Sequence, residues 1–397
     1  MSGAVRATAP SLADACDFIR GVTFDAADAS EHPGIGKTAV LRAGNIQDTL
    51  ELRENLIWVP DAIVSDEQRL RKNDIAICMS SGSPDVVGKT ARVPVDVRAS
   101  IGSFCGIIRP KHPEEALYLS FFFRSAAFRR HRDLSARGAN IQNLRFSQLR
   151  SIKVSIPPDQ ARVAMRLEHA DRVRRNRKYA LQLTSSLLPA MFQRLFGDPA
   201  SNRLGWPRRS FEAVAPSRLG KMLDARQQTG RHGRPYLRNE NVQWDRFDLR
   251  SVSVMDFDAE DRKEFVLLPG DLLICEGGEP GRAAIWRSEL PECYFQKALH
   301  RARVEPSLAV PEYLLYLLWA LARNGGLADY VTSATIAHLT GEKLKEALIP
   351  VPPLPRQQEF VAAVRRVARL RRVQEEALRQ AEHLTASLLY QAFRNSL

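Results

Sequence analysis

The sequence LRAGNIQ at residues 41–47 recurs in altered form as LRNENVQ at residues 237–243. Further along, DIAIC at 74–78 is matched by DLLIC at 271–275, and a loop that contains glycine follows each motif. Collinear matches at nearly constant separation are hard to obtain by chance, and they are the signature of a duplicated structural unit. We therefore expect two copies of one unit, related by an internal repeat of about 195–201 residues.

Two later matches extend the repeat towards the end of each copy. The segment IQNL at 141–144 aligns with IAHL at 336–339, and LTSSLL at 183–188 aligns with LTASLL at 384–389. Earlier in each copy, short runs rich in Val and Ile alternate with Gly, Pro, Asp and Ser, which predicts strands and turns, and segments with helical spacing lie between them. The predicted fold class is therefore α+β, with two similar domains.

A long segment of helical character follows each predicted domain. Residues 159–188 contain neither Gly nor Pro and carry apolar residues at heptad-like spacing, and Pro189 is expected to kink or end this helix. Because long isolated helices gain little stability in water, the two are expected to pair as an antiparallel coiled coil that separates the domains. The apolar seam of the second helix is predicted at Phe360, Ala363, Val367, Leu370, Ala377, Ala381, Leu384 and Leu388.

These patterns divide the chain into four parts, in which each α+β domain precedes its long helix. The predicted boundaries are 1–150 for the first domain, 151–205 for the first helix and its linker, 206–345 for the second domain, and 346–397 for the second helix.

The composition favours a polyanionic partner. Lys and Arg number 58 against 45 Asp and Glu, which gives a formal charge of +13. Nucleic acid or an acidic membrane surface would suit this charge, and a basic protein with another role stays open. The five cysteines lie far apart without metal-type spacing, so a reducing cytoplasm is expected. No apolar run of about 18 residues occurs, and neither export nor membrane insertion is predicted.

Motifs for catalysis and metal binding are not found in the sequence. HPGIGKT at 32–38 resembles the end of a phosphate-binding loop, but Glu31 stands where glycine is required. No histidine pair has metal-site spacing, and no Asn-Pro-Pro-aromatic or Asp-Pro-Pro-aromatic tetrapeptide of an adenine methyltransferase occurs. His300 and His338 are interpreted as structural or surface residues. The chain is therefore predicted not to be an enzyme and to bind neither metal nor cofactor.

Polar residues on predicted turns are candidates for reading base edges. Asn and Gln can bond adenine bidentately, Arg can bond guanine, and Lys reaches phosphate. Asn45 and Gln47 in the first copy match Asn241 and Gln243 in the second. A structural role in a turn or cap stays open for each of these four residues.

Several segments together resemble the specificity subunits of type I restriction-modification systems. In the second copy these are YLRNENVQWDRFDL (236–249), PGDLLICEGGEPGRAAIW (269–286), FQKALHR (295–301) and VPPLPRQQEF (351–360). The first copy carries the same resemblance in DIAICMSSGSPDVVGK (74–89), NIQNLRFSQLRSIKVSIPP (140–158) and SLLPAMFQRLFGDP (186–199). One departure is that the first helix has Pro189 where the second has Tyr390.

The resemblance implies two target-recognition domains, each reading one half of a bipartite site in double-stranded DNA, with the two helices as spacers. It also implies two modification subunits, which bring S-adenosylmethionine and methylate adenine N6, and two restriction subunits, which use ATP and magnesium. The predicted DNA-binding residues lie on loops of both copies: Arg42, Asn45, Gln47, Ser81, Ser83, Lys89, Asn140, Gln142, Asn143, Arg145, Arg238, Asn241, Gln243, Trp244, Arg246, Gly278, Arg282, Gln296, Lys297 and Lys343.

Two alternatives of other classes stay open. One is an enzyme, a fused methyltransferase or nuclease with unrecognised motifs, and the other is a basic coiled-coil adaptor that assembles proteins without reading DNA.

Overall fold

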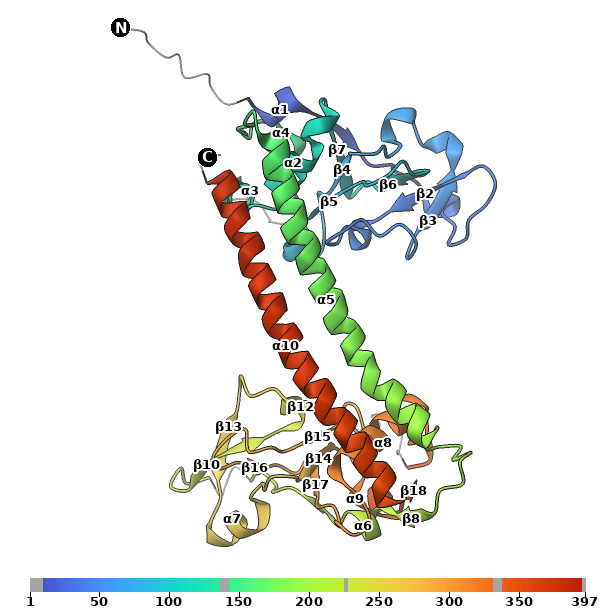
Figure 1. The fold of residues 1–397 in the computed structure, drawn as a ribbon, viewed down its shortest axis with the longest axis vertical. Helices are drawn as coiled ribbons and strands as arrows, with labels where there is room; N and C mark the ends of the chain where they lie inside the picture. The colour runs from blue at the N-terminus through green and yellow to red at the C-terminus, as the bar shows by residue number, and fades with distance from the viewer. Residues whose placement is uncertain (1–9, 136–142, 225–227, 331–337, 395–397) are drawn as a thin grey trace. The chain divides into compact units, whose positions relative to one another are not determined.

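A computed structural model describes residues 10–135, 143–224, 228–330 and 338–394 (Figure 1). The chain divides into two compact units. The first unit comprises residues 1–180 and 375–397, and the second comprises residues 181–374. Each unit therefore contains one β-rich domain and part of both long helices.

The first unit contains two small sheets. The four-stranded sheet is antiparallel, in the order β1 (Cys16–Arg20), β7 (Cys105–Pro110), β4 (Ile75–Cys78) and β5 (Thr90–Arg92). The three-stranded sheet has the order β3 (Ile57–Pro60), β2 (Lys37–Leu41) and β6 (Ala99–Ile101), in which β2 and β6 are parallel. The short helices are α1 (Leu12–Ala15), α2 (Ala116–Phe122), α3 (Ala126–Ser135) and α4 (Phe146–Arg150).

The second unit repeats this arrangement. Its four-stranded antiparallel sheet has the order β15 (Ala283–Ile285), β14 (Leu272–Cys275), β17 (Leu299–Ala302) and β9 (Ser217–Leu219). Its three-stranded sheet has the order β13 (Ser253–Asp256), β10 (Gly233–Leu237) and β16 (Tyr294–Phe295). Two strand pairs complete it: β11 (Val242–Gln243) with β12 (Arg246–Phe247), and β8 (Arg208–Ser210) with β18 (Leu348–Pro350). The short helices are α6 (Phe211–Val214), α7 (Ala259–Phe265), α8 (Pro311–Arg323) and α9 (Gly341–Glu346).

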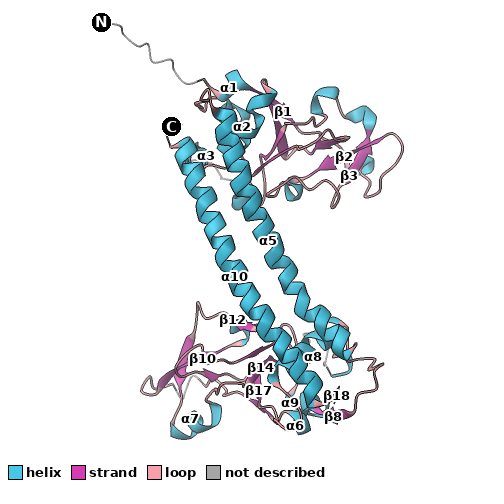
Figure 2. Cartoon of the chain, in the orientation of Figure 1, coloured by secondary structure: helices cyan, strands magenta, loops and turns pink. Residues whose placement is uncertain are grey.

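The two units share one topology, as the repeat predicts. The order β9-β17-β14-β15 corresponds to β1-β7-β4-β5, and β10 pairs in parallel with β16 as β2 does with β6. An ion pair on a buried Asp is repeated as well. Asp74 Oδ1 lies 2.8 Å from Arg109 Nε, and Asp271 Oδ1 lies 2.8 Å from Arg303 Nε. The prediction of two similar α+β domains is therefore confirmed (Figure 2).

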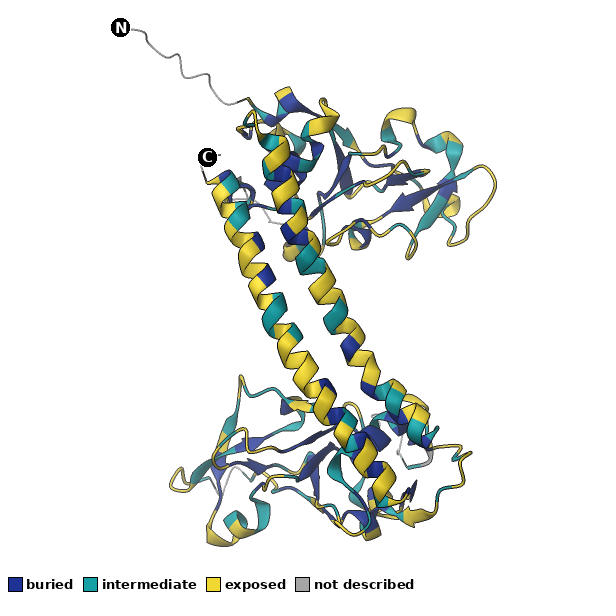
Figure 3. Ribbon diagram, viewed as in Figure 1, coloured by how far each residue is buried: buried dark blue, intermediate teal, exposed yellow. Residues whose placement is uncertain are grey.

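The central strand of each domain is buried on both faces. Ile75 and Ile77 belong to the core under the helices, whereas Ala76 and Cys78 belong to the core between the sheets. Successive side chains of a strand point to opposite faces, so an unbroken apolar motif such as IAIC suits a strand covered on both sides. The matching LLIC motif of β14 is divided between two cores in the same way. In Figure 3 the sheet strands of both domains are coloured largely as buried.

Two long helices join the units. Helix α5 (Gln160–Phe196) begins in the first unit and ends in the second, and α10 (Leu354–Phe393) runs from the second unit into the first. Of the two outcomes predicted for Pro189, a kink or an end of the first helix, the end is wrong, because α5 continues to Phe196. Phe192 and Phe196 are buried in the core of the second unit, and this packing holds the last turns in place despite the hydrogen bond that proline removes.

Within the second unit the two helices pack antiparallel. Thr184 Oγ1 donates a hydrogen bond of 2.5 Å to Gln374 Oε1, and further along α5 the rings of Phe192 and Phe196 lie 5.6 and 5.7 Å from that of Phe360. Residue numbers rise on one helix while they fall on the other at these contacts. Phe192, Phe196 and Phe360 belong to the core cluster of the second unit, so this end of the helix pair is also part of the domain core.

The predicted seam of α10 is correct in one row and wrong in the other. Phe360, Val367 and Ala381 are buried as expected, but Leu370 and Leu384 are 43% and 52% exposed. The second buried row lies one residue later and includes Val364 and Thr385. Apolar residues occupy both rows, as in Ala363 and Val364, so spacing alone did not decide between steps of three and four. In the described part of the chain, no helix is both long and apolar enough to cross a membrane.

Candidate nucleic-acid interface

A cavity of about 760 Å³ in the first unit brings three predicted loops together. Its lining includes Arg42 and Asn45 from the loop after β2, Ser81 from the loop after β4, and Asn143 from the segment before α4. These positions are far apart in the sequence, yet all were predicted to face DNA. The other lining residues are Phe24, Ala43, Gly44, Asn55, Ser80, Gly82, Gly102, Ser103, Phe104 and Cys105.

Backbone hydrogen bonds fix these loops to one another. Ser80 forms a β-bridge with Asn143, and the N–H of Leu144 donates to the carbonyl of Met79 at 2.8 Å. The carbonyl of Phe104 accepts from the N–H groups of Met79 and Ser80 at 2.9 and 3.0 Å. The loop after β4 is therefore held between the 143 segment and the turn that joins β6 to β7.

The second unit repeats this loop cluster. Gly277 forms a β-bridge with His338, and the N–H of Leu339 donates to the carbonyl of Glu276 at 2.7 Å. The N–H of Glu276 in turn donates to the carbonyl of Ala298 at 3.1 Å. The same backbone framework thus presents different side chains in the two units.

One close backbone approach underlies each cluster. A Cβ atom added to Gly21 would lie 2.1 Å from the carbonyl oxygen of Gly102, and one added to Gly220 would lie 2.4 Å from that of Gln296. Both distances are shorter than any real carbon–oxygen contact. Glycine is therefore required at both places, because the segment that directly follows β1 or β9 passes against the backbone of the turn beside it.

The structure assigns Asn45 and Asn241 to the backbone rather than to a free surface. Asn45 is 2% exposed, its Oδ1 accepts from the N–H of Arg42 at 2.8 Å, and its Nδ2 donates to the carbonyls of Glu51 and Glu54. Asn241 makes the equivalent bonds to Arg238 and the loop that follows. The prediction that these two side chains read bases is wrong, because both are buried and saturated with hydrogen bonds.

Three further predicted residues lie beside the long helices instead. Gln47 and Lys89 line a cavity of about 880 Å³ next to α5 and α10 in the first unit, and Trp244 lines a cavity of about 570 Å³ at the corresponding place in the second. The amides of Gln47 and Gln243 each donate to a backbone carbonyl of their own loop, at 2.7 and 3.0 Å. The cavity of Ser81 and Asn143 in the first unit therefore does not include Gln47 or Lys89. Trp244 lies in the second unit, beside the helices there.

The remaining candidates differ in how free their polar groups are. Arg238 is ion-paired with Glu240, and Arg282 pairs with Glu279 at 3.3 Å and donates to the carbonyl of Asn239 at 3.0 Å. Gly278 is exposed with a positive φ of 75°. Asn140 and Gln142 lie outside the described residues. Exposed or partly exposed candidates are Arg42, Ser81, Ser83, Asn143, Arg145, Gln243, Arg246, Gln296, Lys297 and Lys343.

Sequence reasoning missed the turn between β6 and β7. Ser103 and Phe104 line the cavity of the first unit, and Phe104 is 69% exposed. The signal available was the Gly-Ser pair in ASIGSFCGII, which marks a turn between two strands. Phe24 and Asn55 also line the cavity and were not anticipated.

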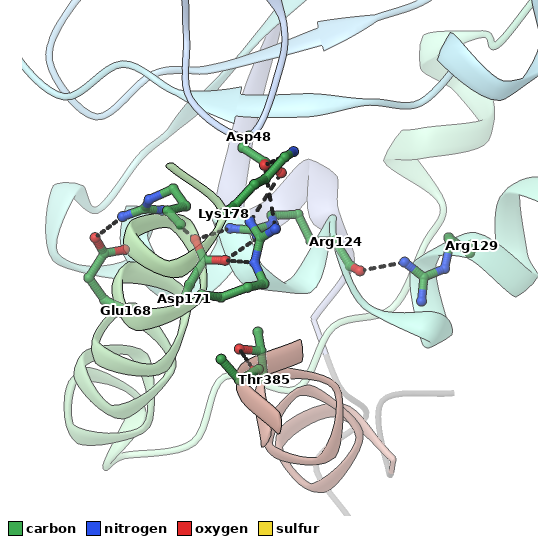
Figure 4. Close-up of polar contacts among 10 residues, drawn as sticks. Asp48, Arg124, Arg129, Glu168, Asp171, Lys178 and Thr385 are labelled. Atoms are coloured by element: carbon green, nitrogen blue, oxygen red, sulfur yellow. Dashed lines mark hydrogen bonds and ion pairs between the residues drawn. The ribbon is translucent and has the colours of Figure 1, made fainter. Parts of the chain in front are cut away.

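A dense ion-pair cluster lines the cavity beside the helices in the first unit (Figure 4). Asp171 of α5 is fully buried, and its carboxylate lies 2.7 Å from Arg124 and 2.9 Å from Arg174. Asp48, from the loop after β2, lies 3.1 Å from Arg174 and 2.9 Å from Lys178. The cluster therefore connects the domain to the helix through charged side chains.

The neighbouring cations determine the charge state of both carboxylates. Burial alone would raise the pKa of Asp48, but hydrogen bonds from Lys178 and Arg174 outweigh it and lower the pKa to about 2. Burial likewise opposes ionisation of Asp171, and Arg124 and Arg174 hold its pKa below the usual range. Both groups are therefore carboxylates at neutral pH.

Among the described residues, no cluster of three or more His, Cys, Asp or Glu side chains could hold a metal ion. Burial raises the pKa of Cys16 and Cys293 to about 12 and that of Cys275 to about 11, so these thiols are poor nucleophiles at neutral pH. His300 is buried with a lowered pKa, and its Nε2 lies 3.1 Å from the carbonyl of Leu339.

The family model described as type I restriction modification DNA specificity domain matches the chain twice, over residues 10–178 and 205–382. The two matches cover most of the sequence. The chain belongs to this family. Each match covers most of one copy of the repeat and includes one loop cluster with its central strand.

Curated members of the specificity-domain family cover nearly the whole chain. The type I restriction enzyme EcoKI specificity subunit of Escherichia coli (strain K12) is 26% identical over 96% of this chain and 87% of its own length. The type I restriction enzyme StySPI specificity subunit of Salmonella potsdam is 25% identical over 98% of this chain and 89% of its own length.

Two solved structures share the fold of this chain. A chain from a study of complex assembly and conformational transition of the type I R-M system superimposes with a TM-score of 0.59 at 18% identity and covers 100% of both chains. The type I restriction-modification system S subunit from M. genitalium gives 0.55 at 13% identity, over 98% of both chains.

Proposed function

We propose that this chain is the DNA-specificity subunit of a type I restriction-modification complex and reads a bipartite site, one half with each unit. The observation that carries the proposal is the loop cluster that occurs in both units on one backbone framework with different side chains. Two related surfaces suit two half-sites of different sequence. Direct readout requires side chains that can enter the major groove, and exposed loops supply them.

The first surface offers Ser81 and Asn143 to base edges, with Arg42 and Arg145 near enough in the chain to contact phosphates. The second offers Gln296 and Lys297 on the turn before β17, with Arg246 and Lys343 exposed on other elements. Phosphate contacts fix register and make binding sensitive to salt, whereas each good bidentate base contact discriminates by about 1–3 kcal/mol. We therefore assign sequence choice to the loop clusters and affinity largely to the basic residues.

The long helices act as spacers in this proposal. Their antiparallel packing in the second unit supports a coiled coil whose length sets the distance between half-sites. Two modification subunits supply S-adenosylmethionine and methylate adenine N6, and two restriction subunits supply the chemistry that uses ATP and magnesium. The chain itself contributes recognition and assembly.

The direct test is to co-express the chain with the modification subunit of its own system and map methylated adenines on genomic DNA by long-read sequencing. We expect one split motif with a modified adenine in each half. The modification subunit expressed alone is the control and should leave no such motif. Methylation without any motif, from a soluble complex, would instead support the adaptor. Methylation or cleavage by the purified chain alone would support an enzyme.

Matched variants test the assignment of surfaces to half-sites. Ser81→Ala with Asn143→Ala should relax one half of the motif and leave the other intact, whereas Lys297→Ala should affect only the second half. As a control, Asn45→Ala should lower stability without a selective change in either half, because its side chain bonds only to backbone in its own loop. A change in both halves from either surface variant would contradict the proposal.

A further inference from the structure

The turn between β6 and β7 places a large apolar side chain on the surface of the first unit. Phe104 is 69% exposed, although its neighbours in the cavity lining include Ser81, Ser103 and Asn143. Single exposed apolar residues are ordinary on protein surfaces. What distinguishes Phe104 is its place, within the loop cluster that the proposed function assigns to base reading.

The backbone of this turn is held rigidly. The N–H of Cys105 donates to the carbonyl of Gly102 at 2.8 Å, which closes the turn around Ser103 and Phe104. The carbonyl of Phe104 accepts two further hydrogen bonds from Met79 and Ser80. The ring is therefore presented from a backbone that is held by hydrogen bonds, and this backbone has little conformational entropy left to lose on binding.

The second unit has the same turn with other side chains. The N–H of Leu299 donates to the carbonyl of Gln296 at 3.0 Å, and the carbonyl of Ala298 accepts from Glu276 as that of Phe104 accepts from Met79. Lys297 thus takes the place of Ser103, and Ala298 takes the place of Phe104. The turn changes from apolar and bulky to basic and small while its hydrogen bonds stay the same.

An exposed aromatic ring among hydroxyl and amide groups suits one feature of a base edge in the major groove. The C5-methyl group of thymine is the apolar group there, and Phe is among the side chains that contact it. Adjacent hydroxyl and amide groups would bond the polar atoms of neighbouring bases. We propose that Phe104 is a specificity-determining residue that contacts a thymine methyl group in the half-site read by the first unit. This inference rests on the proposed function.

The test uses the complex of the full chain with its modification subunits and the motif found for the wild type. Each thymine of either half-site is replaced in turn by deoxyuridine, which removes only the methyl group, and equilibrium binding to each duplex is measured. At one position of one half-site we expect wild-type affinity to fall about fourfold, the effect of one buried methyl group. The Phe104→Ala complex should bind the thymine and uracil duplexes equally.

Val95→Ala is the matched control, because Val95 is another exposed apolar residue of the first unit, at 53%, and does not line the cavity. It should keep the fourfold preference. Thermal unfolding of Phe104→Ala should match the wild type, since the ring is mostly exposed.

Two results with the Phe104→Ala variant would overturn the inference alone: an unchanged uracil effect, or an equal loss of affinity for every duplex. A wild-type complex with a motif but no uracil effect at any thymine would do so as well. Failure of the proposed function has a different signature, because a wild-type complex would then show no bipartite motif at all.

Discussion

The two units use the same architecture to join a domain to the long helices, but charged groups are arranged differently beside that junction. In the first unit, Asp171 and Asp48 are bridged by Arg and Lys side chains. In the second, the cavity at the equivalent place is lined by Trp244, Tyr316 and Trp319 together with charged residues, of which Asp245 pairs with Arg287 at 2.9 Å. Both units also pack a phenylalanine of a long helix on a tyrosine of the domain, Phe393 on Tyr118 and Phe192 on Tyr313. The duplicated framework therefore keeps aromatic packing at both junctions, and the first unit adds an ionic cluster around the fully buried Asp171.

The comparison predicts different sensitivities to substitution, salt and acid. Aromatic packing loses most when atoms are removed, since a cavity remains and the transfer free energy is lost. An ionic cluster with partly exposed cations loses less, because water can solvate the charges that remain.

The largest effect is expected from Phe360→Ala in the second unit. Phe360 is fully buried, and its ring lies 5.2 to 5.7 Å from those of Tyr316, Phe192 and Phe196. We expect a loss of about 3–5 kcal/mol in the free energy of unfolding. Hydrogen exchange measured by mass spectrometry should show faster exchange in α8.

Val163→Ala is the control for that substitution, because Val163 stands at the matching place at the start of α5. It should cost about 1–2 kcal/mol, for two methyl groups. Equal effects of the two variants would contradict the asymmetry.

Asp171→Asn should give the next largest effect. The carboxylate is fully buried, but the side chains of Arg124 and Arg174 are 25% and 13% exposed, so part of the uncompensated charge can reach water. We expect a loss of about 2 kcal/mol in stability, below the value for a fully buried pair. The loss should appear in the exchange of α2 and not of α8; faster exchange in both helices would argue against a local role.

The contribution of Asp171 should also depend on pH. Its pKa is lowered in the folded chain, so the stabilisation is present above the unfolded pKa of about 3.9 and disappears as the pH falls through the folded value. The difference in unfolding free energy between wild type and Asp171→Asn should therefore be constant from pH 7 to about 5 and shrink below pH 4. Urea unfolding at a series of pH values measures this difference. A difference that grows as the pH falls would contradict the prediction.

The smallest effect is expected from Asp48→Asn. Its side chain is 37% exposed, and Lys178 is 50% exposed, so solvent screens the pair. A loss of about 0.5 kcal/mol is expected at low ionic strength, and it should vanish near 1 M salt. Thermal unfolding at the two salt concentrations tests this, with Phe360→Ala as the variant whose effect should not depend on salt.

Sequence reasoning recovered the fold because the repeat and the spacing of apolar residues can be read directly from the sequence. The motifs DIAIC and DLLIC marked the central strands, and the glycine-free stretch marked α5. Pro189 misled, since tertiary packing of Phe192 and Phe196 outweighs the lost hydrogen bond. One row of the α10 seam was misplaced by one residue, because the buried row combines the apolar Val364 with the polar Thr385.

The candidate interface was recovered less completely, and the reason is physical. Asn45 and Asn241 have side chains suited both to bases and to turns, and only burial distinguishes the two uses. Gln47 and Ser81 are both on loops, but which loops share a cavity depends on strand pairing that spacing does not reveal. Phe104 was not predicted as an interface residue, because its role depends on its exposure, and exposure cannot be read from the sequence.

The close approach at Gly21 and Gly220 bears on how such a protein can diversify. With no room for a side chain there, the junction between each strand and its turn is closed to variation, while the two residues at the tip of each turn are held by main-chain hydrogen bonds. Under the proposed function, substitutions of the tip residues in one unit would change the half-site read by that unit and leave the other half-site unchanged. Because the two units vary independently, the number of possible bipartite target sequences is the product of the numbers of half-sites that each unit can read.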